Sequence, residues 1–492
     1  MKKVNVRRVC LLLAVLLTAA LSLTGCAKQN YAISAIHADG TYTVTAPDGA
    51  EYRYAYMTAA SEAAKTFDVT TFGAKGDGVT DDTQAFADAF SALRSGDSLY
   101  IPEGKFLVNE SLVLDLQNVR IYGEAKKSEV LFGRTQGAND TPADASLFRL
   151  GAQAAHVTVE DLILTYTGDY CAADASVGKS CGLYIDGSNV TARGLTVSGF
   201  SYAGIVAAGA DGVPAAQIRI DGCLLEKNRT AGIVCGDVDE LNVFANTFRA
   251  NGDAADETVG WGFMTADGCA PRDVRILANH FNENFVGGVR MAAGDVVDIS
   301  ENTFVSNVIC AVDARGDLAD VKISSNQINS MNAKSSQTIY AVAVGGTGNF
   351  TVTNNMIKKF GAGSGKAIAF IVDVADGTLR ITENTMQCAA VDAFIDGKAD
   401  GTDINCSSNA FTATSGLNKV GVSLTGKSLT LVDNVFKVSA MNGCAVAFAG
   451  DADATVITAG NVAELPKKAA FADIDAKVVK TDGNFLNGSL IS

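Results

Sequence analysis

The sequence is poor in the residues that most often build metal or imidazole-based sites. Three histidines, His37, His156 and His280, are scattered through 492 residues, and the 11 cysteines show no Cys-x-x-Cys spacing. A zinc site needs several such ligands at close spacing, so we expect no metal site built from them. Proline is scarce too, with six residues, whereas hydrophobic residues make up 48% of the chain and charged residues 19%. This composition excludes a disordered or collagen-like chain.

Positive charge is also in short supply. The chain has 39 Lys and Arg against 54 Asp and Glu, a formal charge of −15, and four of the basic residues lie within the first eight positions. Without those four, 35 basic residues face 54 acidic ones, a charge of −19. A body this acidic, with no Lys/Arg-rich run, is a poor electrostatic partner for nucleic acid or anionic lipid. We therefore expect no nucleic-acid partner.

The one long apolar run lies at the N-terminus. A basic stretch, 2–8, precedes an apolar stretch, 9–23, that is too short to span a bilayer comfortably. It ends in Leu23-Thr24-Gly25-Cys26, which resembles the lipobox of bacterial lipoproteins. We expect residues 1–26 to be a signal peptide and Cys26 to be lipidated, so that a lipid anchor alone holds the protein at the cell membrane or an outer membrane. An ordinary secretory signal or an uncleaved anchor is the alternative.

Residues 27–66 are expected to form a tether and a small β-meander, because short alternating segments there are separated by Asp39-Gly40 and Asp48-Gly49. Three further segments, 67–86, 99–108 and 119–124, then follow in order. They hold a Gly-rich turn leading into Asp81-Asp82-Thr83, then Pro102-Glu-Gly104, then a strand ending at Gly123.

In this order the three segments resemble the opening of the pectin-lyase-like right-handed parallel β-helix proteins. That group includes polygalacturonases, rhamnogalacturonases, polysaccharide lyases, epimerases and phage tailspikes. The resemblance implies the fold and a polysaccharide partner, but it does not choose among those activities. The Gly-rich turn should lead into a helix that begins near Asp81–Thr83 and carries Phe86, Phe90 and Leu93 on one face. Such a helix can cap the first coil, whose strand edges would otherwise be exposed.

A repeat over 157–461 predicts the same fold independently. Its template is apolar-x-apolar-x-x-Asn-x-apolar, and successive asparagines lie 33, 23, 24, 29, 29, 25, 25 and 27 residues apart. The asparagines are Asn246, Asn279, Asn302, Asn326, Asn355, Asn384, Asn409, Asn434 and Asn461. A strand-rich period in the twenties is typical of a β-solenoid. With three earlier coils, we expect an all-β right-handed parallel β-helix of about twelve coils over 67–465, and a C-terminal tail over 466–492. The asparagines should stack between coils as a structural column.

Aligning the coils on the asparagine predicts an outward-facing column on a second strand. The column is Val206, Val234, Met264, Arg290 and Asp313, with Arg290 and Asp313 as stacked neighbours. An exposed ion pair, worth about 0–1 kcal/mol, is the simpler interpretation of these two residues. A charge pair in a substrate groove is the functional one.

A polygalacturonase-type hydrolase is disfavoured by this alignment. In that family, as aligned here, two acids precede this strand and a histidine lies nearby, since inverting hydrolysis needs carboxylates on opposite faces of the sugar. Here those places hold Tyr202-Ala203, Thr230-Ala231, Gly260-Trp261 and similar pairs.

A lyase is compatible with the residues that are present. β-Elimination needs a base, and a positive charge to hold a uronate carboxylate. Lys227, Arg229, Glu283 and Arg290, placed on adjacent coils, are the candidate catalytic residues. Trp261, Asp313 and Tyr202 are the candidate substrate-binding residues, because the loop 251–261 carries the single tryptophan. No cofactor is required, although Ca²⁺ could bridge the acidic body to an acidic glycan.

The function expected from the sequence is therefore a cell-surface lipoprotein that binds or processes polysaccharide along a β-helix groove, with a lyase as one activity. The alternative is a non-catalytic glycan-binding or surface-structural β-helix rod.

Overall fold

The computed structural model describes residues 32–36, 41–45, 51–55, 65–135, 137, 139–168, 179–210, 212–329, 338–361, 367–417, 420–441 and 443–491. The chain forms two compact units, Met1–Glu62 and Ala63–Ser492. In the first unit, β1 (Ala32–Ile36), β2 (Thr41–Thr45) and β3 (Glu51–Ala55) pair antiparallel in that order. The expected β-meander is therefore present. Its predicted turns, the signal peptide and Cys26 lie outside the described residues.

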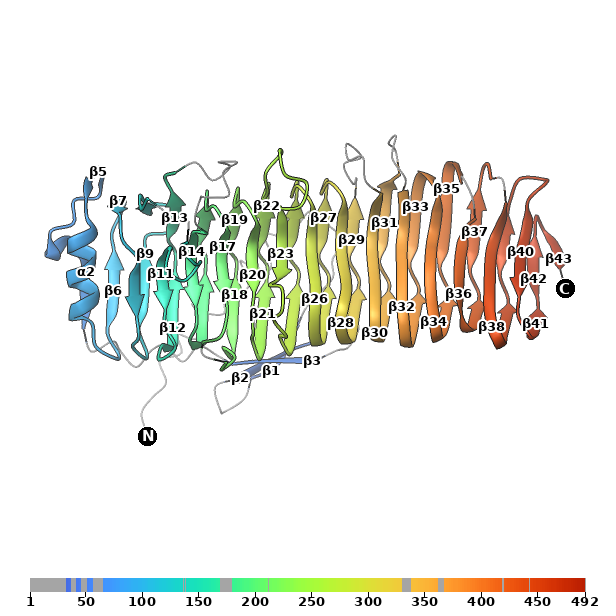
Figure 1. The fold of residues 1–492 in the computed structure, drawn as a ribbon, viewed down its shortest axis with the longest axis horizontal. Helices are drawn as coiled ribbons and strands as arrows, with labels where there is room; N and C mark the ends of the chain where they lie inside the picture. Colours follow the sequence, from blue (N-terminus) through green and yellow to red (C-terminus); the bar gives the residue numbers. More distant parts are fainter. Residues whose placement is uncertain are drawn as a thin grey trace. The chain divides into compact units, whose positions relative to one another are not determined.

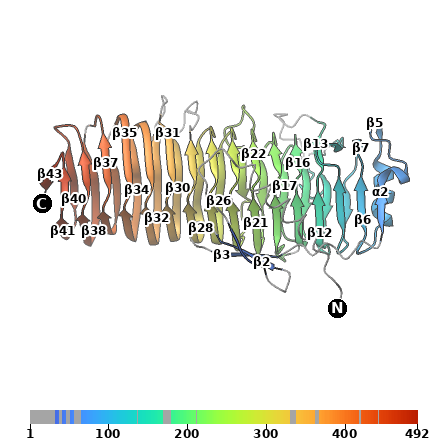
Figure 2. The same ribbon diagram turned by 180° about the vertical axis from the view of Figure 1, so that it is seen from behind.

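The second unit is a parallel β-helix of about 14 turns, close to the twelve expected. Figures 1 and 2 show the turns stacked in sequence order from the helix α2 to the C-terminus. Each turn contributes one strand to each of three columns, in which strands of successive turns pair in parallel. The interior between the columns is the hydrophobic core.

The first column holds the strands that follow the longest loops. Its early members are β8 (Leu112–Leu114), β11 (Ser146–Leu150), β14 (Cys181–Ile185), β17 (Ala203–Ala207), β20 (Ala231–Cys235) and β23 (Trp261–Thr265). The second column begins with β4 (Thr66–Asp68), β6 (Ser98–Ile101), β9 (Arg120–Gly123), β12 (Ala155–Glu160), β15 (Ser188–Arg193), β18 (Ile218–Asp221), β21 (Glu240–Phe244) and β24 (Asp273–Leu277).

From β26 onward a single long strand serves both of these columns. These strands are β26 (Gly287–Ser300), β28 (Cys310–Ser324), β30 (Ile339–Thr353), β32 (Ala367–Thr382), β34 (Ala393–Ser407), β36 (Val422–Val432) and β38 (Cys444–Ala459). A glycine at the corner allows the strand to bend without a loop. Gly346 has φ 109°, and a Cβ there would lie 2.0 Å from the carbonyl oxygen of Gly316 in the turn before.

The third column consists of shorter strands. They are β5 (Asp77–Asp81), β7 (Gly104–Val108), β10 (Ser128–Phe132), β13 (Ile163–Tyr166), β16 (Thr196–Ser198), β19 (Leu224–Glu226), β22 (Thr247–Arg249), β25 (His280–Asn282), β27 (Thr303–Val305), β29 (Gln327–Asn329), β31 (Met356–Phe360), β33 (Thr385–Val391), β35 (Ala410–Leu417), β37 (Val435–Val438), β39 (Val462–Glu464) and β42 (Asn484–Leu486). The last strand, β43 (Ser489–Ile491), turns back antiparallel onto β42.

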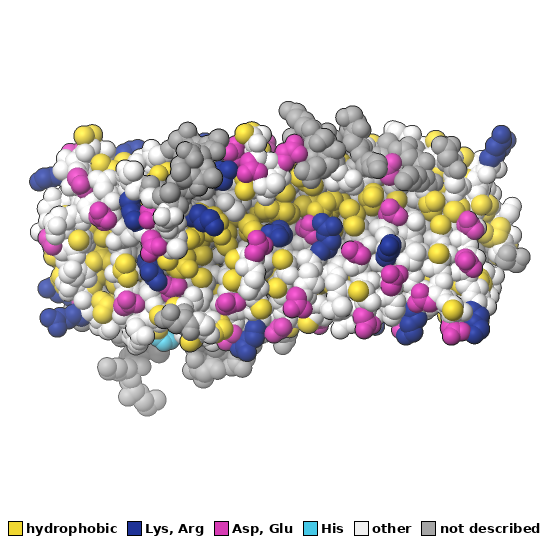
Figure 3. Space-filling view, in the orientation of Figure 1, with side chains coloured by type: hydrophobic (Ala, Val, Ile, Leu, Met, Phe, Trp, Pro, Cys, Tyr) yellow, Lys and Arg dark blue, Asp and Glu magenta, His cyan; other side chains and the backbone are white. Residues whose placement is uncertain are grey.

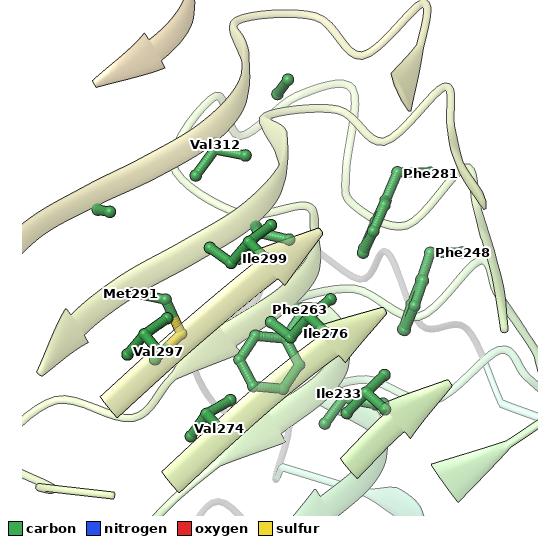
Figure 4. Packing of buried hydrophobic residues seen from close by; sticks show 14 of the residues in the cluster. Ile233, Phe248, Phe263, Val274, Ile276, Phe281, Met291, Val297, Ile299 and Val312 are labelled. Atoms are coloured by element: carbon green, nitrogen blue, oxygen red, sulfur yellow. The ribbon is translucent and has the colours of Figure 1, made fainter. Parts of the chain in front are cut away.

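Aromatic rings of the third column stack inside the core. The ring centroids of Phe248 and Phe281 lie 4.6 Å apart, and those of Phe281 and Phe304 lie 4.8 Å apart, with nearly parallel planes. Figure 4 shows the first two rings face to face among aliphatic side chains from the other columns. A Cβ on Gly262 or Gly288 would lie 2.4 Å from Phe281 or Phe304, so the small residues at these strand starts make room for the rings.

The asparagine column is structural, as expected. From Asn246 to Asn461 each side-chain amide donates to the Oδ1 of the next asparagine, over 2.8–3.1 Å. A second ladder, which the repeat template did not reveal, joins Asn228, Asn251, Asn284 and Asn307 over 2.9–3.2 Å. Both ladders satisfy buried backbone groups at turns between columns.

The N-terminal cap matches the expectation. A short 3-10 helix, η1 (Val69–Phe72), precedes α2 (Thr83–Ala92), and Phe86, Phe90 and Leu93 are buried against the first turns. The carboxylate of Asp81 accepts the backbone N–H of Thr83 at 3.0 Å. Asp82 is buried and accepts the backbone N–H groups of Lys75 and Gly76. The Asp81-Asp82 pair therefore holds the cap together.

The C-terminal residues require a correction. Residues 466–492 were expected to be a tail, but most of them form another turn: β40 (Ala470–Asp475) and β41 (Val478–Asp482) pair in parallel with β38. Asn484 also extends the first asparagine ladder, accepting from Asn461 at 2.8 Å. The apolar pattern is weak here because β41 is exposed at every position, as a terminal turn with one open side can be.

Candidate functional site

The predicted outward column lies on the first strand column. Val206 pairs in register with Val234, Val234 with Met264, Met264 with Arg290 and Arg290 with Asp313. The stacking of Arg290 beside Asp313 is therefore confirmed. Before this series the outward position holds Arg149 and Tyr184 in successive turns, and Ala343 and Ile371 follow it.

Apolar side chains on this outer face form a cluster separate from the core, which we call the outer band. Its buried members are Cys181, Ala203, Val206, Ala231, Val234, Trp261, Met264, Val286, Ile309, Cys310, Tyr340 and Ala343. Partly exposed side chains extend it: Tyr184, Tyr202, Ala208, Ala266, Val308 and Ile371. Figure 3 shows apolar side chains gathered along this face, with Lys, Arg, Asp and Glu beside them. The buried members form the floor of the band, and its partly exposed side chains are the part that a ligand could contact.

Trp261 lies in the floor of the outer band. It begins β23 beside Ala231 and Gly287, and its side chain is 6% exposed. A Cβ on Gly287 would lie 2.6 Å from the indole ring, so this glycine leaves room for the ring. Trp261 is therefore packed under the surface instead of standing on the loop 251–261 with its ring open to solvent.

Two partly exposed tyrosines carry the aromatic surface of the band. Burial raises the pKa of both Tyr184 and Tyr202 to about 12, so both phenols stay neutral at physiological pH. The ammonium of Lys179 lies 5.4 Å from the ring centroid of Tyr202, and the guanidinium of Arg149 lies 5.7 Å from that of Tyr184. Tyr202 thus remains a candidate for ligand contact.

Arg290 pairs with a carboxylate other than the one expected. Its guanidinium donates to Asp267 at 3.3 Å, and the Asp267 side chain is 85% exposed. Asp313 is paired elsewhere, although its strand position is adjacent. Strand register determines which positions are neighbours, but the long side chain of Arg290 bonds to Asp267, which follows β23 in the preceding turn.

Asp313 is the centre of a polar trio that the sequence reading missed. Its carboxylate accepts from Arg315 at 2.5 and 2.7 Å and from the hydroxyl of Tyr340 at 2.7 Å. Burial raises the pKa of Tyr340, and the hydrogen bonds that Arg315 donates to the Asp313 carboxylate raise the pKa of Arg315. Tyr340 was hidden because the segment 331–338 interrupts the repeat, but Ile339-Tyr340-Ala341-Val342 carries the strand alternation that could have revealed it.

Lys227 and Glu283 occupy a backbone turn beside the second asparagine ladder. Both are exposed with positive φ, 54° and 57°, each directly before a ladder asparagine. The prediction that the candidate catalytic residues lie on adjacent coils is wrong for Lys227 and Glu283. The turn of Ala250 lies between them, since the N–H of Lys227 donates to Arg249 and that of Ala250 donates to Asn282. The same intervening turn continues into β23, which carries Met264 of the outward column.

Arg229 forms ion pairs with the insertion 251–261. It lies 3.2 Å from Asp256 and 3.6 Å from Asp253. Hydrogen bonds from Thr258, with a smaller contribution from Arg229, lower the pKa of Asp256, so this carboxyl is charged at neutral pH. Arg229 therefore positions a loop at the edge of the outer band.

Within the described ranges, no group of three or more His, Cys, Asp or Glu side chains is gathered as a metal site would require. His280 is half-buried in β25 of the third column, away from the outer band, and burial lowers its pKa. None of the described helices is long and apolar enough to cross a membrane.

Comparison with known proteins agrees with this architecture. Residues 66–158 match the family model described as rhamnogalacturonase A/epimerase, pectate lyase-like, and residues 153–328 match the right-handed β-helix region. Each of the two models covers less than half of the chain, so they show similarity to pectate lyase-like and right-handed β-helix proteins over these residues. The two matches together cover the cap, the early turns and most of the outer band.

Individual relatives align over limited lengths. A probable polygalacturonase of Arabidopsis thaliana is 44% identical over 63 residues, 13% of this chain and 13% of the plant protein. Plasmin and fibronectin-binding protein A of Streptococcus pneumoniae is 26% identical over 288 residues, 49% of this chain and 39% of that protein. The chain thus spans less than half of either relative. The solved structure of bacteriophage phi29 gene product 12 is 16% identical, with a TM-score of 0.47, over 86% of this chain and 75% of that one.

Proposed function

We propose that this protein binds a polysaccharide lengthwise along the outer band. The observation that carries the proposal is the band itself. Its buried members come from seven successive turns, β14 to β30, with tyrosines at its surface and Arg/Asp pairs along it. At about 4.8 Å per stacked strand, this surface is about 30 Å long, which suits a linear chain of several sugar units.

Flat tyrosine faces and methyl-rich side chains suit the apolar faces of sugar rings, and paired charges beside them supply hydrogen bonds for hydroxyls. The family model for pectate lyase-like proteins and the alignment with a probable polygalacturonase support polysaccharide as the ligand class.

The side chains at Asp313 favour binding over turnover. β-Elimination needs a base that is free of its proton near neutral pH. The pKa values of Tyr340 and Arg315 are raised, so both hold their protons, and the Asp313 carboxylate accepts hydrogen bonds from both. A lyase remains the second candidate, because Arg290 and Arg315 lie on either side of Asp313 and could together hold a uronate carboxylate.

We also propose that the protein is held at the bacterial cell surface by an acylated Cys26. The N-terminal residues 2–26 have the pattern of a lipoprotein signal, and a glycan-binding rod would work on such a tether.

A glycan panel with two readouts tests the binding proposal. The full-length protein would be titrated against neutral, uronate-containing and sulfated polysaccharides, and each mixture assayed for new reducing ends and for ultraviolet absorbance from an unsaturated product. Binding without either product is the expected result. Absorbance together with new ends would establish a lyase, and no binding to any glycan would overturn the proposal.

A matched pair of variants locates the site. Met264→Asp places a charge in the middle of the outer band and should reduce affinity at least tenfold. Ser423→Asp also introduces a carboxylate in this outward column, two turns beyond Ile371. Ser423→Asp should leave binding unchanged, and equal effects of the two variants would move the site away from the band.

A further inference from the structure

The arginines along the outer band are already neutralised by carboxylates. Arg149 pairs with Asp186 at 2.8 Å, Arg290 with Asp267 at 3.3 Å and Arg315 with Asp313 at 2.5 Å. At the band's edge Arg229 pairs with Asp256 at 3.2 Å. Each of these four arginines thus has an anion beside it, whereas the ammonium of Lys179 lies beside the ring of Tyr202.

In two of these pairs, separating the arginine from its carboxylate would cost free energy. Asp186 is buried, with 3% of its side chain exposed, and 14% of the Asp313 side chain is exposed. A ligand carboxylate that drew Arg149 or Arg315 away would leave a largely desolvated aspartate without its counterion. The whole chain also carries a formal charge of −15, which repels a polyanion at a distance.

The rest of the outward column carries no charge. Between Arg149 and Arg290 it consists of Tyr184, Val206, Val234 and Met264. Tyr184 is partly exposed, whereas Val206, Val234 and Met264 are 5%, 1% and 9% exposed and form a buried apolar floor. A ligand therefore meets chiefly tyrosine rings here, and methyl or methylene groups suit such faces better than charged groups do. The paired arginines and aspartates keep donor and acceptor positions for sugar hydroxyls.

We infer that the ligand of the outer band is a neutral polysaccharide bearing apolar substituents, such as acetyl, methyl ester or deoxy groups, and not a polyuronate. This inference rests on the proposed glycan-binding function and names its ligand class.

The decisive experiment compares glycans that share a backbone but exchange a charged group for a neutral ester or acetamide. Polygalacturonate and its fully methyl-esterified form share one backbone, and chitin and chitosan oligosaccharides share another. These are placed in a panel with acetylated, deoxy, uronate and sulfated glycans, and every binder is re-measured at 50 and 500 mM NaCl. The expected strongest binders are neutral members with acetyl, ester or deoxy groups, and their affinity should change less than twofold with salt.

One variant tests the charge argument directly. Asp267→Asn removes the exposed partner of Arg290 without touching the band, so folding should be unaffected. It should raise affinity for uronate glycans at least threefold and make that binding salt-sensitive, while affinity for neutral binders stays the same. Asp403→Asn, which removes the exposed ion-pair partner of Lys427 on a late turn, is the matched control and should change no affinity.

The outcomes separate the two proposals. If uronates or sulfated glycans bind most tightly, with affinity falling as salt rises, the neutral-ligand inference is overturned while glycan binding stands. The neutral-ligand inference is also overturned if uronate glycans bind the wild type and Asp267→Asn does not raise their affinity. If no glycan in the panel binds, both proposals fail.

Discussion

At the scale of single residues, Arg290 is a position where a substitution should affect ligand affinity much more than the stability of the fold. Its partner Asp267 is almost fully exposed, and exposed pairs of this kind contribute about 0–1 kcal/mol to stability. Its strand neighbours are Met264 in the band and Asp313 in the polar trio. The guanidinium therefore lies where a ligand crossing the band would meet its donors.

We expect Arg290→Ala to weaken glycan affinity about tenfold and to shift the melting temperature by 2 °C or less, the shift that about 0–1 kcal/mol allows in a chain of this size. The matched control is Lys427→Ala, which removes an exposed ion pair with Asp403 on a late turn. The control should share the small thermal effect and leave affinity unchanged. An affinity loss no larger than that of Lys427→Ala would leave Arg290 as a surface ion-pair partner only.

Buried thiols give the folded protein a pH dependence at alkaline pH. Burial raises the pKa of Cys223 from an ordinary value of 9.0 to about 12. Between these values the unfolded thiol loses its proton while the folded one keeps it, so the unfolded state binds fewer protons and stability falls as pH rises. The loss attributable to one such thiol is about 1 kcal/mol between pH 9 and pH 10.

Urea unfolding of the wild type and Cys223→Ala, at pH 8, 9 and 10, checks this expectation. Tyrosine and lysine titrations are common to both proteins, so the difference between their pH slopes isolates the thiol. Cys223→Ala should lose less stability from pH 9 to pH 10 than the wild type. Parallel slopes would show that Cys223 ionises alike in both states.

At the scale of elements, the asparagine ladder joins one turn to the next. Asn302 donates to the carbonyl oxygen of Ile276 at 2.8 Å and to Asn326 at 3.1 Å, and it accepts from Asn279 at 3.0 Å. It is fully buried, so water cannot replace these partners. An interrupted ladder leaves polar groups unsatisfied in the two adjacent turns.

Asn302→Ala should therefore destabilise the β-helix by about 2–4 kcal/mol, since several buried groups lose their partners at once. Asn349→Ala is the control, because Asn349 is exposed and accepts only from the hydroxyl of Thr378 among its described contacts. Thermal and urea unfolding measure both variants. Equal, small shifts would mean that the ladder contributes little to the stability of the stack.

The sequence predicted those elements whose pattern has a physical period. The asparagine spacing and the inward/outward alternation are such patterns, and so the outward column as far as Asp313 and the cap helix with Phe86 were found. Tyr340 was missed because an insertion broke the alignment, and the last turn because its strand is exposed on every side. The burial of Trp261 and the pairing of Arg290 with Asp267 depend on side-chain packing between neighbouring turns, which periodicity does not encode.

At the scale of the whole molecule, the proposed glycan binding and the proposed lipid on Cys26 belong together. The acidic body has little electrostatic attraction for anionic lipid. A lipid on Cys26 would hold the proposed glycan-binding face at the cell surface. An acyl anchor of two or more chains holds a protein stably, because each buried methylene contributes about 0.8 kcal/mol.

We therefore expect Cys26→Ala to abolish membrane attachment or to leave an unprocessed precursor when the full chain is expressed in a bacterial host. Wild-type protein should enter the detergent phase of a Triton X-114 extract and incorporate labelled palmitate, and the variant should do neither as a processed species. Cys10→Ala, a change to the other cysteine of the N-terminal segment, is the matched control and should behave as wild type. If Cys26→Ala keeps wild-type mobility, labelling and detergent partition, the anchor is not at Cys26, and an uncleaved apolar segment becomes the better account of any attachment.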